Sequence, residues 1–409
     1  MGAADAAAAA ATSATSRLRI IVTGLAGLYP LGGVAFDYLQ YMLGWARLGH
    51  DVIYHEDTWS WPYHPRENRH VGDGSYSAAF LAKFFASYAP ALAGCWHYLH
   101  LHETSYGMPR PAFAEFARTA DLFVNVSGAG MIPEELGPHA IKVFLDTDPG
   151  YNQIMLSERF AWSEHVERWC ASVAAHDRHF TYAENMGAPD CTVPGAGFRW
   201  RTTRMPVVLD LWAPLVARAP GPGAPWTTVM TWNAWKGRLV YAGVEYESKG
   251  AQFERIIDLP RAVPVPLRVA VGGAGAPRAR LAAHGWTVAD GPASTLTPDQ
   301  YQEFIAGSRA EISPAKHVYV ATRSGWFSCR SACYLASGRP VVVEDTGFGA
   351  KIPAGEGLLA YRTPEEAAAA IGEVEGDYAA HAAAARAVAA EHFDSDRVLA
   401  RFLADVETA

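Results

Sequence analysis

Hydroxyl and guanidinium side chains gather in one short part of this chain, residues 322–347. The pattern predicts a helix that begins near Ser328 and ends at Gly338, followed by a buried strand that opens at Pro340. A helix N-terminus carries free backbone N–H groups and a partial positive charge, and Ser and Arg side chains add donors that suit a diphosphate. We therefore expect a diphosphate site formed by Arg323, Ser324, Ser328, Arg330 and Ser331. For single residues, the alternatives are a helix cap at Ser328 and solvated surface arginines.

Several carboxylates and one histidine are placed where they could accept a proton from a hydroxyl or an amine. Asp146 and Asp148 follow an apolar strand, and open α/β sheets bind ligands beyond the carboxyl ends of their strands. Asp37 lies near a glycine-rich loop, and His102 forms a further candidate pair with the adjacent Glu103. Our first choice of catalytic base is Asp148, followed by Asp37 and His102. The alternative role of Asp146 and Asp148 is to cap a turn.

Alternating strands and helices must position these groups. Residues 18–22 form a short β-branched run that is typical of a buried parallel strand, and a glycine-rich loop follows it. Apolar residues recur at helical spacing over 34–48, and a second strand covers 51–54. Further strands are predicted at 121–126, 141–146, 179–182, 238–242, 267–271, 311–313 and 340–344. Such alternation is typical of parallel sheets joined by right-handed crossovers.

A shift in composition near residue 218 divides the chain in two. Residues 219–225 are rich in Pro and Gly and cannot be helical, and a chain of 409 residues suits two α/β domains of roughly 200 residues each. We predict the fold class α/β, with two doubly wound, Rossmann-like domains facing a cleft. The predicted parts are a disordered leader (1–16), a Rossmann-like first domain (17–205), a linker (206–225), a Rossmann-like second domain (226–390) and a C-terminal helix that returns to the first domain (391–409).

Bulk properties exclude several classes of protein. The formal charge of −8 argues against a general nucleic-acid binder, because it provides no broad cationic surface. Five cysteines do not indicate a secreted disulfide framework. The leader lacks a signal-peptide pattern, and no apolar run reaches the roughly 18 residues of a membrane span, so we expect a cytoplasmic protein without an integral membrane segment. The Ala-, Arg-, Gly- and Pro-rich composition is typical of a high-GC bacterial source.

Six segments, in order along most of the chain, resemble motifs of the GT-B glycosyltransferase superfamily. The segment CYLASGRPVVVEDTGFG at 333–349 is similar to the helix and strand that follow the diphosphate loop in bacterial enzymes of the glycosyltransferase family 4 type. Residues 29–52 resemble the first-domain glycine loop and helix, and residues 239–250 resemble the strand and Lys-Gly turn that open the donor site. Residues 267–275, 308–316 and 355–371 resemble the next strand and glycine turn, the strand before the diphosphate loop, and the closing segment.

This resemblance implies a GT-B fold in which the first domain (17–205) binds the acceptor and the second domain (226–390) binds the nucleotide sugar, and it implies roles for further residues. Lys249 is similar to the basic residue that meets the donor phosphates, and Asn233 is placed to line the same cleft. Glu344 is a candidate contact to the ribose or the donor sugar, and Gly32 and Gly33 match the loop between donor and acceptor. The alternatives are a solvated turn lysine at 249 and a strand-end carboxylate facing water at 344.

One departure from the family pattern concerns stereochemistry. Many retaining members carry two glutamates about eight positions apart around the diphosphate helix, and this sequence has Gly325 and Cys333 there. The chain is therefore not a standard member of the commonest retaining family, and the sequence leaves the choice between inversion and retention open.

The resemblance implies transfer of a sugar from a nucleoside-diphosphate sugar to a small acceptor, a natural product or a glycan precursor, that bears a hydroxyl or an amine. The aromatic segment 59–64 is suited to stack on a sugar or an aromatic acceptor, or to pack in the core. Asp146-Thr147-Asp148 has the letters of a metal-binding Asp-x-Asp motif but lies in the acceptor domain, so we expect no metal. We expect no cofactor besides the nucleotide sugar as co-substrate.

Two other functions stay open, and a third is disfavoured. A sugar-nucleotide epimerase would use the same diphosphate site, and so would a non-catalytic sugar-nucleotide-binding protein. A dinucleotide oxidoreductase is disfavoured because Gly24 and Gly27 do not complete a G-x-G-x-x-G fingerprint. The sequence leaves a homodimer open.

Overall fold

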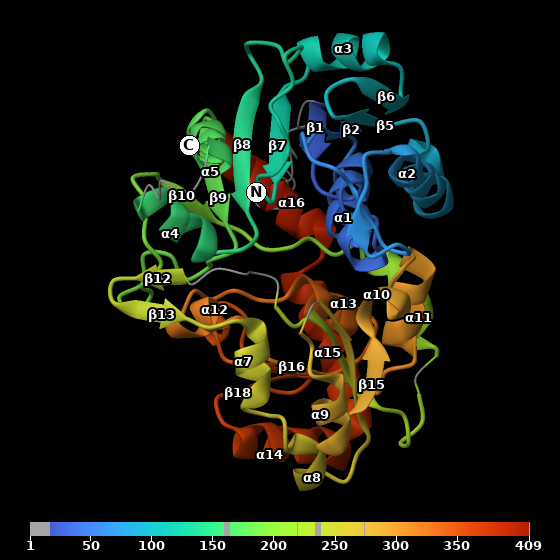
Figure 1. Cartoon of the computed structure of the whole chain (residues 1–409), viewed down its shortest axis with the longest axis vertical. Helices are drawn as coiled ribbons and strands as arrows, with labels where there is room; N and C mark the ends of the chain where they lie inside the picture. The colour runs from blue at the N-terminus through green and yellow to red at the C-terminus, as the bar shows by residue number, and fades with distance from the viewer. Residues whose placement is uncertain (1–16, 159–163, 219, 234–238, 274, 409) are drawn as a thin grey trace, which may run out of the picture.

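Two sheets, one in each half of the chain, form two domains that lie one above the other in Figure 1; the second sheet is parallel throughout and the first has one antiparallel pair. The computed structural model describes residues 17–158, 164–218, 220–233, 239–273 and 275–408, so the leader predicted at 1–16 lies outside the described residues. The predicted fold class, with two doubly wound α/β domains facing a cleft, is confirmed.

The first sheet is centred on the strand that opens the described chain. Its strands follow the order β10 (Trp200–Thr202), β9 (Arg178–Thr181), β8 (Ile141–Asp146), β7 (Leu122–Val126), β1 (Arg19–Thr23), β2 (Asp51–Glu56), β5 (Trp96–His100) and β6 (Thr104–Gly107). All neighbours are parallel except β5 and β6, which form an antiparallel hairpin at one edge. A separate small hairpin joins β3 (Tyr63–His64) to β4 (Arg69–His70).

The helices of the first domain are α1 (Gly32–Arg47), α2 (Ser75–Tyr88), α3 (Arg110–Arg118), α4 (Tyr151–Glu158) and α5 (Glu164–Ala174), with a short 3-10 turn at Pro90–Leu92. Helix α1 packs against β1 and β2 and is buried along most of its length. It therefore lies in the core of the first domain.

The second sheet is entirely parallel, with the order β15 (Thr287–Asp290), β14 (Leu267–Gly272), β11 (Trp226–Thr231), β16 (Glu311–Ser313), β17 (Val341–Glu344) and β18 (Leu358–Tyr361). Its helices are α7 (Lys249–Glu254), α8 (Leu259–Ala262), α9 (Arg278–Ala283), α10 (Gly291–Ser294), α11 (Pro298–Ala306), α12 (His317–Ala321), α13 (Cys329–Ala336), α14 (Pro364–Gly376) and α15 (Tyr378–His392), with a 3-10 turn at Phe348–Ala350. Because every strand is parallel, the loops after all six strands emerge at the same edge of the sheet.

Most predicted strands lie on observed strands of these two sheets, within one or two residues at each end. The prediction at 238–242 is wrong in its pairing: β12 (Leu239–Tyr241) forms an antiparallel hairpin with β13 (Val244–Tyr246), outside the parallel sheet. The central strand β11 escapes prediction because half of its residues are polar. Its buried Thr227 hydroxyl is satisfied by Ser308 Oγ at 2.6 Å and by Tyr334 Oη at 2.7 Å.

The predicted linker at 206–225 is more ordered than its composition suggests. It contains a 3-10 turn at Leu209–Leu211 and the short helix α6 (Ala213–Val216). Trp212 between them is fully buried, and its indole N–H donates to Gln40 Oε1 at 3.0 Å. The same oxygen accepts the Val208 N–H at 3.1 Å, so the linker is anchored to α1.

The C-terminal helix α16 (Ser395–Glu407) packs against α1, beneath the first sheet. Asp394 caps the helix, because its side chain accepts the N–H of Asp396. The ring of Phe402 lies 5.8 Å from Trp45 and 4.4 Å from Phe180. This close packing depends on Gly44, where a Cβ atom would lie 2.4 Å from Leu399 Cδ1.

We predict that Gly44→Ala destabilises the protein by about 1–3 kcal/mol, because the buried Leu399 side chain must move to accept the methyl group. Gly372→Ala is the matched control: this glycine also lies inside a helix, and nothing lies within 4 Å of its added Cβ. The control should gain up to about 1 kcal/mol from helix propensity alone. Urea unfolding measures the change in the free energy of unfolding for both variants. Changes of the same sign in the two variants would contradict this packing.

Candidate active site between the domains

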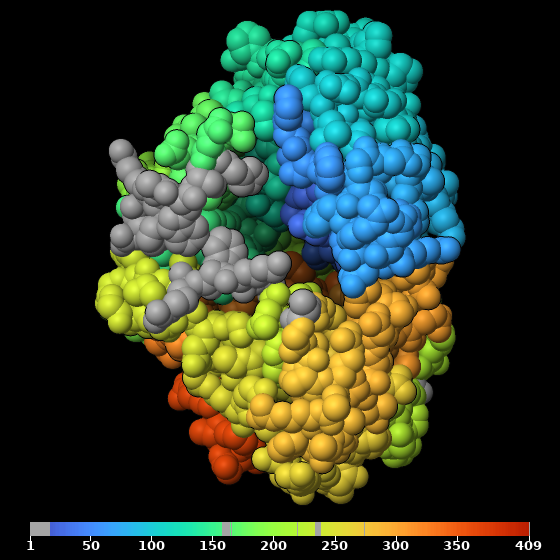
Figure 2. Space-filling view, in the orientation of Figure 1, coloured from blue at the N-terminus to red at the C-terminus, as the bar shows by residue number. Residues whose placement is uncertain are grey.

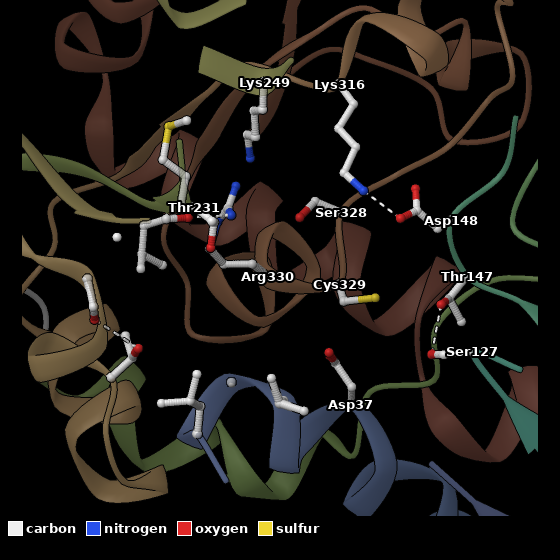
Figure 3. A pocket seen from close by; sticks show the side chains of 18 of the residues that line it. Asp37, Ser127, Thr147, Asp148, Thr231, Lys249, Lys316, Ser328, Cys329 and Arg330 are labelled. Atoms are coloured by element: carbon white, nitrogen blue, oxygen red, sulfur yellow. Dashed lines mark hydrogen bonds and ion pairs between the residues drawn. The ribbon is translucent and has the colours of Figure 1, made fainter. Parts of the chain in front are cut away.

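A cavity of about 460 Å³ lies between the two domains. The first domain contributes the start of α1 and the residues after β7 and β8. The second domain contributes the ends of β11 and β14 and the starts of α7 and α13. The cavity therefore lies at the carboxyl ends of the strands of both sheets, where open α/β sheets bind ligands. Figure 3 shows side chains from both domains pointing into it.

Three basic side chains of the second domain line this cavity: Lys249, Lys316 and Arg330. Arg330 is fixed from below, because its Nε donates to the buried Glu311, its Nη1 donates to Val229 O at 2.8 Å, and its Nη2 donates to Ser313 Oγ. These bonds use three of the five guanidinium N–H groups, so two stay available for a ligand within the described part of the chain.

Lys249 is the first residue of α7, where Ser248 Oγ accepts the N–H of Ala251 and caps the helix. Among the described residues, its ammonium group has no hydrogen-bond or ion-pair partner. Desolvation inside the cleft and the nearby charge of Arg330 lower the pKa of Lys249 well below its usual range. An anion bound here would relieve the repulsion between these cations, so the cluster favours a ligand with several negative charges.

The N-terminus of α13 faces the same cavity. Ser328 is the N-cap residue, but its side chain makes no capping hydrogen bond, so the alternative interpretation of Ser328 as a side-chain cap is wrong. Its hydroxyl and Arg330 both line the cavity, beside the free N–H groups of the first helical turn. This arrangement of helix terminus, hydroxyl and cations is suited to phosphate oxygens.

Asp37 points into the cavity from α1, on the wall opposite the cations (Figure 3). Within the described residues its carboxyl group has no hydrogen-bond or ion-pair partner. Burial raises the pKa of Asp37 to about 7, although the charge of Arg330 acts in the opposite direction. A carboxyl group that titrates near neutral pH is suited to accept a proton from a substrate.

Asp148, our first choice of base, lines the cavity but is engaged across the domain boundary. Its carboxylate pairs with Lys316 Nζ and accepts the hydroxyl of Tyr319, both from the second domain. Asp146 is fully buried and accepts hydrogen bonds from Gln153 Nε2 at 2.6 Å and from the Asp148 N–H at 3.0 Å. Asp146 therefore holds the turn in place, and Asp148 joins the two domains.

Two further predicted residues do not line the cavity, although they lie in the loop before α13. Arg323 has a left-handed backbone with φ of 48°, and its Nε donates to Asp190 Oδ2 at 2.7 Å. Ser324 is fully buried and donates its hydroxyl to Tyr319 O at 3.3 Å. The structure places these two residues in the domain contact rather than beside Lys249.

Ser331, Glu344 and Asn233 also lie outside the cavity. Ser331 and Glu344 line a small void on the other side of the α13 N-terminus, and Ser328 contributes to that void as well. The Ser331 hydroxyl is buried without a hydrogen-bond partner, and Glu344 Oε2 accepts the Ala315 N–H at 2.9 Å. Asn233 is exposed in the loop after β11.

The glycine pair predicted to face a ligand has a second role in domain contact. The Gly32 N–H donates to Thr295 O at 2.9 Å, and a Cβ at this position would lie 2.2 Å from Thr297 O. Gly33 lines the cavity, and a Cβ there would lie 3.2 Å from the ring of Tyr301. Both glycines therefore allow α1 to approach the second domain.

The two positions where the family carries glutamates are also part of the domain contact. Gly325 has φ of 77°, and a Cβ there would lie 2.7 Å from the side chain of Asn185. The Asn185 N–H donates to Ser324 O at 3.0 Å. Cys333 is buried, with its Sγ 4.0 Å from Gln40 Nε2 of α1. Neither position can present a carboxylate to the cavity without rearranging these contacts.

Sequence reasoning misses Lys316, Tyr319 and Trp326, although all three line the cavity. Lys316 follows the end of β16. The expectation that ligands bind beyond the carboxyl ends of parallel strands, which selects Asp148, therefore also identifies this lysine. Trp326 donates its indole N–H to Thr147 O at 3.2 Å, a contact between domains that no local pattern could reveal.

His102 lies in a different cavity of the first domain, away from the three cations. Its Nδ1 lies 2.7 Å from Asp57 Oδ2, and this hydrogen bond raises the pKa of His102 above its usual value. The predicted partner Glu103 is not among the residues that line that cavity.

Two negative findings apply to the part of the chain that the structure describes. No group of three or more His, Cys, Asp and Glu side chains there is placed to hold a metal ion. None of the helices in that part combines the length and the apolar character that crossing a membrane requires.

Comparisons with known proteins identify the fold. The sequence matches no protein-family model and no curated protein. Among solved structures, HepE of Anabaena in complex with UDP is similar with a TM-score of 0.55 and 13% identity, over 96% of this chain and 100% of that one. An alpha-glucosyltransferase in complex with UDP and mismatched DNA is similar with a TM-score of 0.54 and 12% identity, over 96% and 100% of the two chains. Sucrose-phosphate synthase from Thermosynechococcus elongatus is similar with a TM-score of 0.51 and 12% identity, over 96% and 99%.

The chain therefore has the GT-B fold of the glycosyltransferases, as the resemblance in its sequence implies.

We predict that Asp37→Asn stabilises the protein more at pH 8 than at pH 5. The pKa of Asp37 rises from 3.8 to about 7 on folding, so the folded state binds more protons between these values. Stability is therefore lost as the pH rises through this window, and the asparagine removes that loss. Urea midpoints at the two pH values measure the effect. Asp210→Asn, whose side chain is 78% exposed, is the control. If the difference in urea midpoint between Asp37→Asn and wild type does not grow with pH, the buried, unpaired state of Asp37 is contradicted.

Proposed function

We propose that this chain transfers a glycosyl group from a nucleoside-diphosphate sugar to a small acceptor that bears a hydroxyl or an amine. One observation carries the proposal: in the cavity between the domains, three cations and a helix N-terminus face an unpaired carboxyl group that titrates near neutral pH. The cationic wall suits a diphosphate, and the carboxyl group on the opposite wall suits a nucleophile that must lose a proton.

The donor in this proposal is a uridine-diphosphate sugar. Solved structures of the same fold support it, because HepE is described in complex with UDP and with UDP-glucose, and the alpha-glucosyltransferase in complex with UDP-glucose and DNA. The composition of the present chain supports a bacterial source, and with it a natural product or a glycan precursor as the acceptor.

The proposed reaction divides between the two domains. The acceptor oxygen or nitrogen bonds to the anomeric carbon, the bond from that carbon to the phosphate oxygen breaks, and its electron pair stays on the departing nucleoside diphosphate. Lys249, Arg330 and the N–H groups at the start of α13 stabilise the charge that develops on this leaving group. Asp37 takes the proton of the acceptor.

We propose that the transfer needs no metal ion. A diphosphate leaving group must be neutralised, and Lys249, Arg330 and the free N–H groups at the start of α13 are placed to do this. Lys316 helps to neutralise the diphosphate only when its ion pair with Asp148 is weakened. In this proposal, donor binding and the contact between the domains are therefore coupled.

Two alternatives use the same donor cavity. The absence of the family's glutamates at Gly325 and Cys333 favours a protein that binds a sugar nucleotide without turnover. An epimerase would instead convert the sugar nucleotide in the absence of any acceptor. Turnover assays with and without acceptors therefore separate the three functions.

Calorimetric titration with UDP, GDP, ADP and dTDP in the presence of EDTA tests the donor site directly. We expect UDP to bind in the micromolar range and more tightly than the other three nucleotides, and Lys249→Met to weaken UDP binding at least tenfold. A hydrogen bond to a charged group contributes about 1.5–3 kcal/mol, and about 1.4 kcal/mol corresponds to a factor of ten.

Arg323→Met is the matched control for this titration, because Arg323 pairs with Asp190 outside the cavity. It should change the affinity less than twofold. The proposal fails if no nucleotide binds without metal, or if the two variants weaken binding equally.

A further inference from the structure

A second cavity, of about 610 Å³, lies within the first domain. It is enclosed by the loops after β2 and β7, the turn between β5 and β6, and the helices α3 and α5. Figure 2 shows the first domain hollowed on this face, between its blue and green segments. A volume of this size is typical of sites for small organic ligands.

Aromatic rings form much of the wall. His55 and His97 stack on each other and on Phe113, with ring centroids 4.2 Å and 4.5 Å from that phenyl ring. Burial lowers the pKa of His97 to about 4, so its ring is neutral at pH 7. Trp169 and Trp59 also line the cavity. The rings of His55, His97 and Phe113 therefore form an aromatic part of the wall, and the charged side chains Asp57, Glu134, Glu135 and Arg168 line other parts of it.

Trp59 lies at the rim and is 58% exposed, although most large apolar side chains of this chain are buried. Its indole stacks on the imidazole of His102, with ring centroids 5.5 Å apart and planes inclined by 23°. The backbone is left-handed at Trp59, at Leu101 and at His102, with φ of 53°, 48° and 62°. Residues held in this conformation store strain, and such strain concentrates at binding and catalytic sites.

Polar groups converge on one side of the cavity. His102 Nδ1 is bonded to Asp57 Oδ2 at 2.7 Å, and its Nε2 lies 3.6 Å from Glu134 Oε1. The second carboxylate oxygen of Asp57 is buried without a hydrogen-bond partner within the described chain. An apolar pocket with a few oriented polar groups is the usual form of a small-molecule site.

One loop separates this cavity from the cavity between the domains. Val126 and Ser127 line the cavity between the domains, and Gly128, Ala129 and Gly130 line the second cavity. Consecutive residues of this loop therefore form part of the wall of both cavities.

We propose that the second cavity binds a planar aromatic ring of the acceptor, while the reacting hydroxyl or amine extends past Ser127 into the cavity that holds the donor. This assignment rests on the proposed function. The aromatic rings of His55, His97 and Phe113 in the wall, with Trp59 at the rim, favour a flat π-system over a sugar, because a planar ring can stack on such a wall. A hydroxyl or N–H group on the ring would meet the His102–Asp57 pair.

The test uses 4-methylumbelliferone, a planar phenol, with methyl glucoside as a polyol comparator. We expect calorimetry to detect binding of the phenol only. Trp59→Ala should weaken this binding at least fivefold, because stacking on the indole is lost. Trp61→Ala is the matched control, since Trp61 is 57% exposed but does not line the cavity. The affinity of this variant for the phenol should stay within twofold of wild type.

A second ligand tests the polar contact. The 7-methyl ether of 4-methylumbelliferone has lost the phenolic hydrogen and should bind at least threefold more weakly than the phenol.

UDP is titrated into the same samples, which separates this proposal from the proposed function. Unchanged UDP affinity in both tryptophan variants, with weaker binding of the phenol in Trp59→Ala alone, supports the aromatic acceptor site. Binding of UDP without binding of the phenol, equal effects of the two variants, or equal binding of methyl glucoside each overturns it. Binding of the phenol without UDP refutes the proposed function and the acceptor role together.

Discussion

The buried ion pair between Arg330 and Glu311 is the interaction on which the site between the domains depends. Glu311 is fully buried in β16, and Arg330 emerges from the first turn of α13, so the pair fixes that helix over the end of the sheet. Removing one partner of such a pair typically costs about 3–5 kcal/mol, because the other charge stays buried without compensation. The remaining guanidinium N–H groups, Ser328 and the free N–H groups of α13 are therefore held toward the cavity before any ligand arrives. This preorganisation is what a site for a developing negative charge requires.

The two domains are held together by contacts that surround the cavity. Asp148 pairs with Lys316 and Tyr319, Trp326 bonds to Thr147 O, and the Gly32 N–H donates to Thr295 O. Several of these groups also line the cavity, so a ligand that enters must compete with the contacts between the domains. The residues that stand where many retaining GT-B enzymes carry two glutamates belong to the same feature. Gly325 packs on Asn185 and Cys333 packs near Gln40, so this chain uses those positions to join its domains.

The fold was largely predictable from sequence because its strands are short, apolar and β-branched, as at β1 and β17. The strand β11 was not, because the hydroxyl of its buried Thr227 is satisfied by Ser308 and Tyr334, which are distant in sequence. In the site, Lys249, Ser328, Arg330, Asp148 and Asp37 follow strand-end and helix-start patterns, and all of them line the cavity. Arg323 has the right chemistry and the right position along the chain, but a left-handed backbone turns it toward Asp190. The choice between Asp37 and Asp148 depends on which carboxylate finds a partner in the other domain, and one sequence read locally does not contain that information.

A crystal structure of the protein soaked with UDP and no divalent cation tests the central claim most directly. The account predicts the diphosphate between Lys249, Arg330 and the N-terminus of α13, with the Ser328 hydroxyl bonded to a phosphate oxygen and Asp37 on the opposite wall. A nucleotide found elsewhere, or a diphosphate bound through Arg323 and away from Lys249, would contradict it.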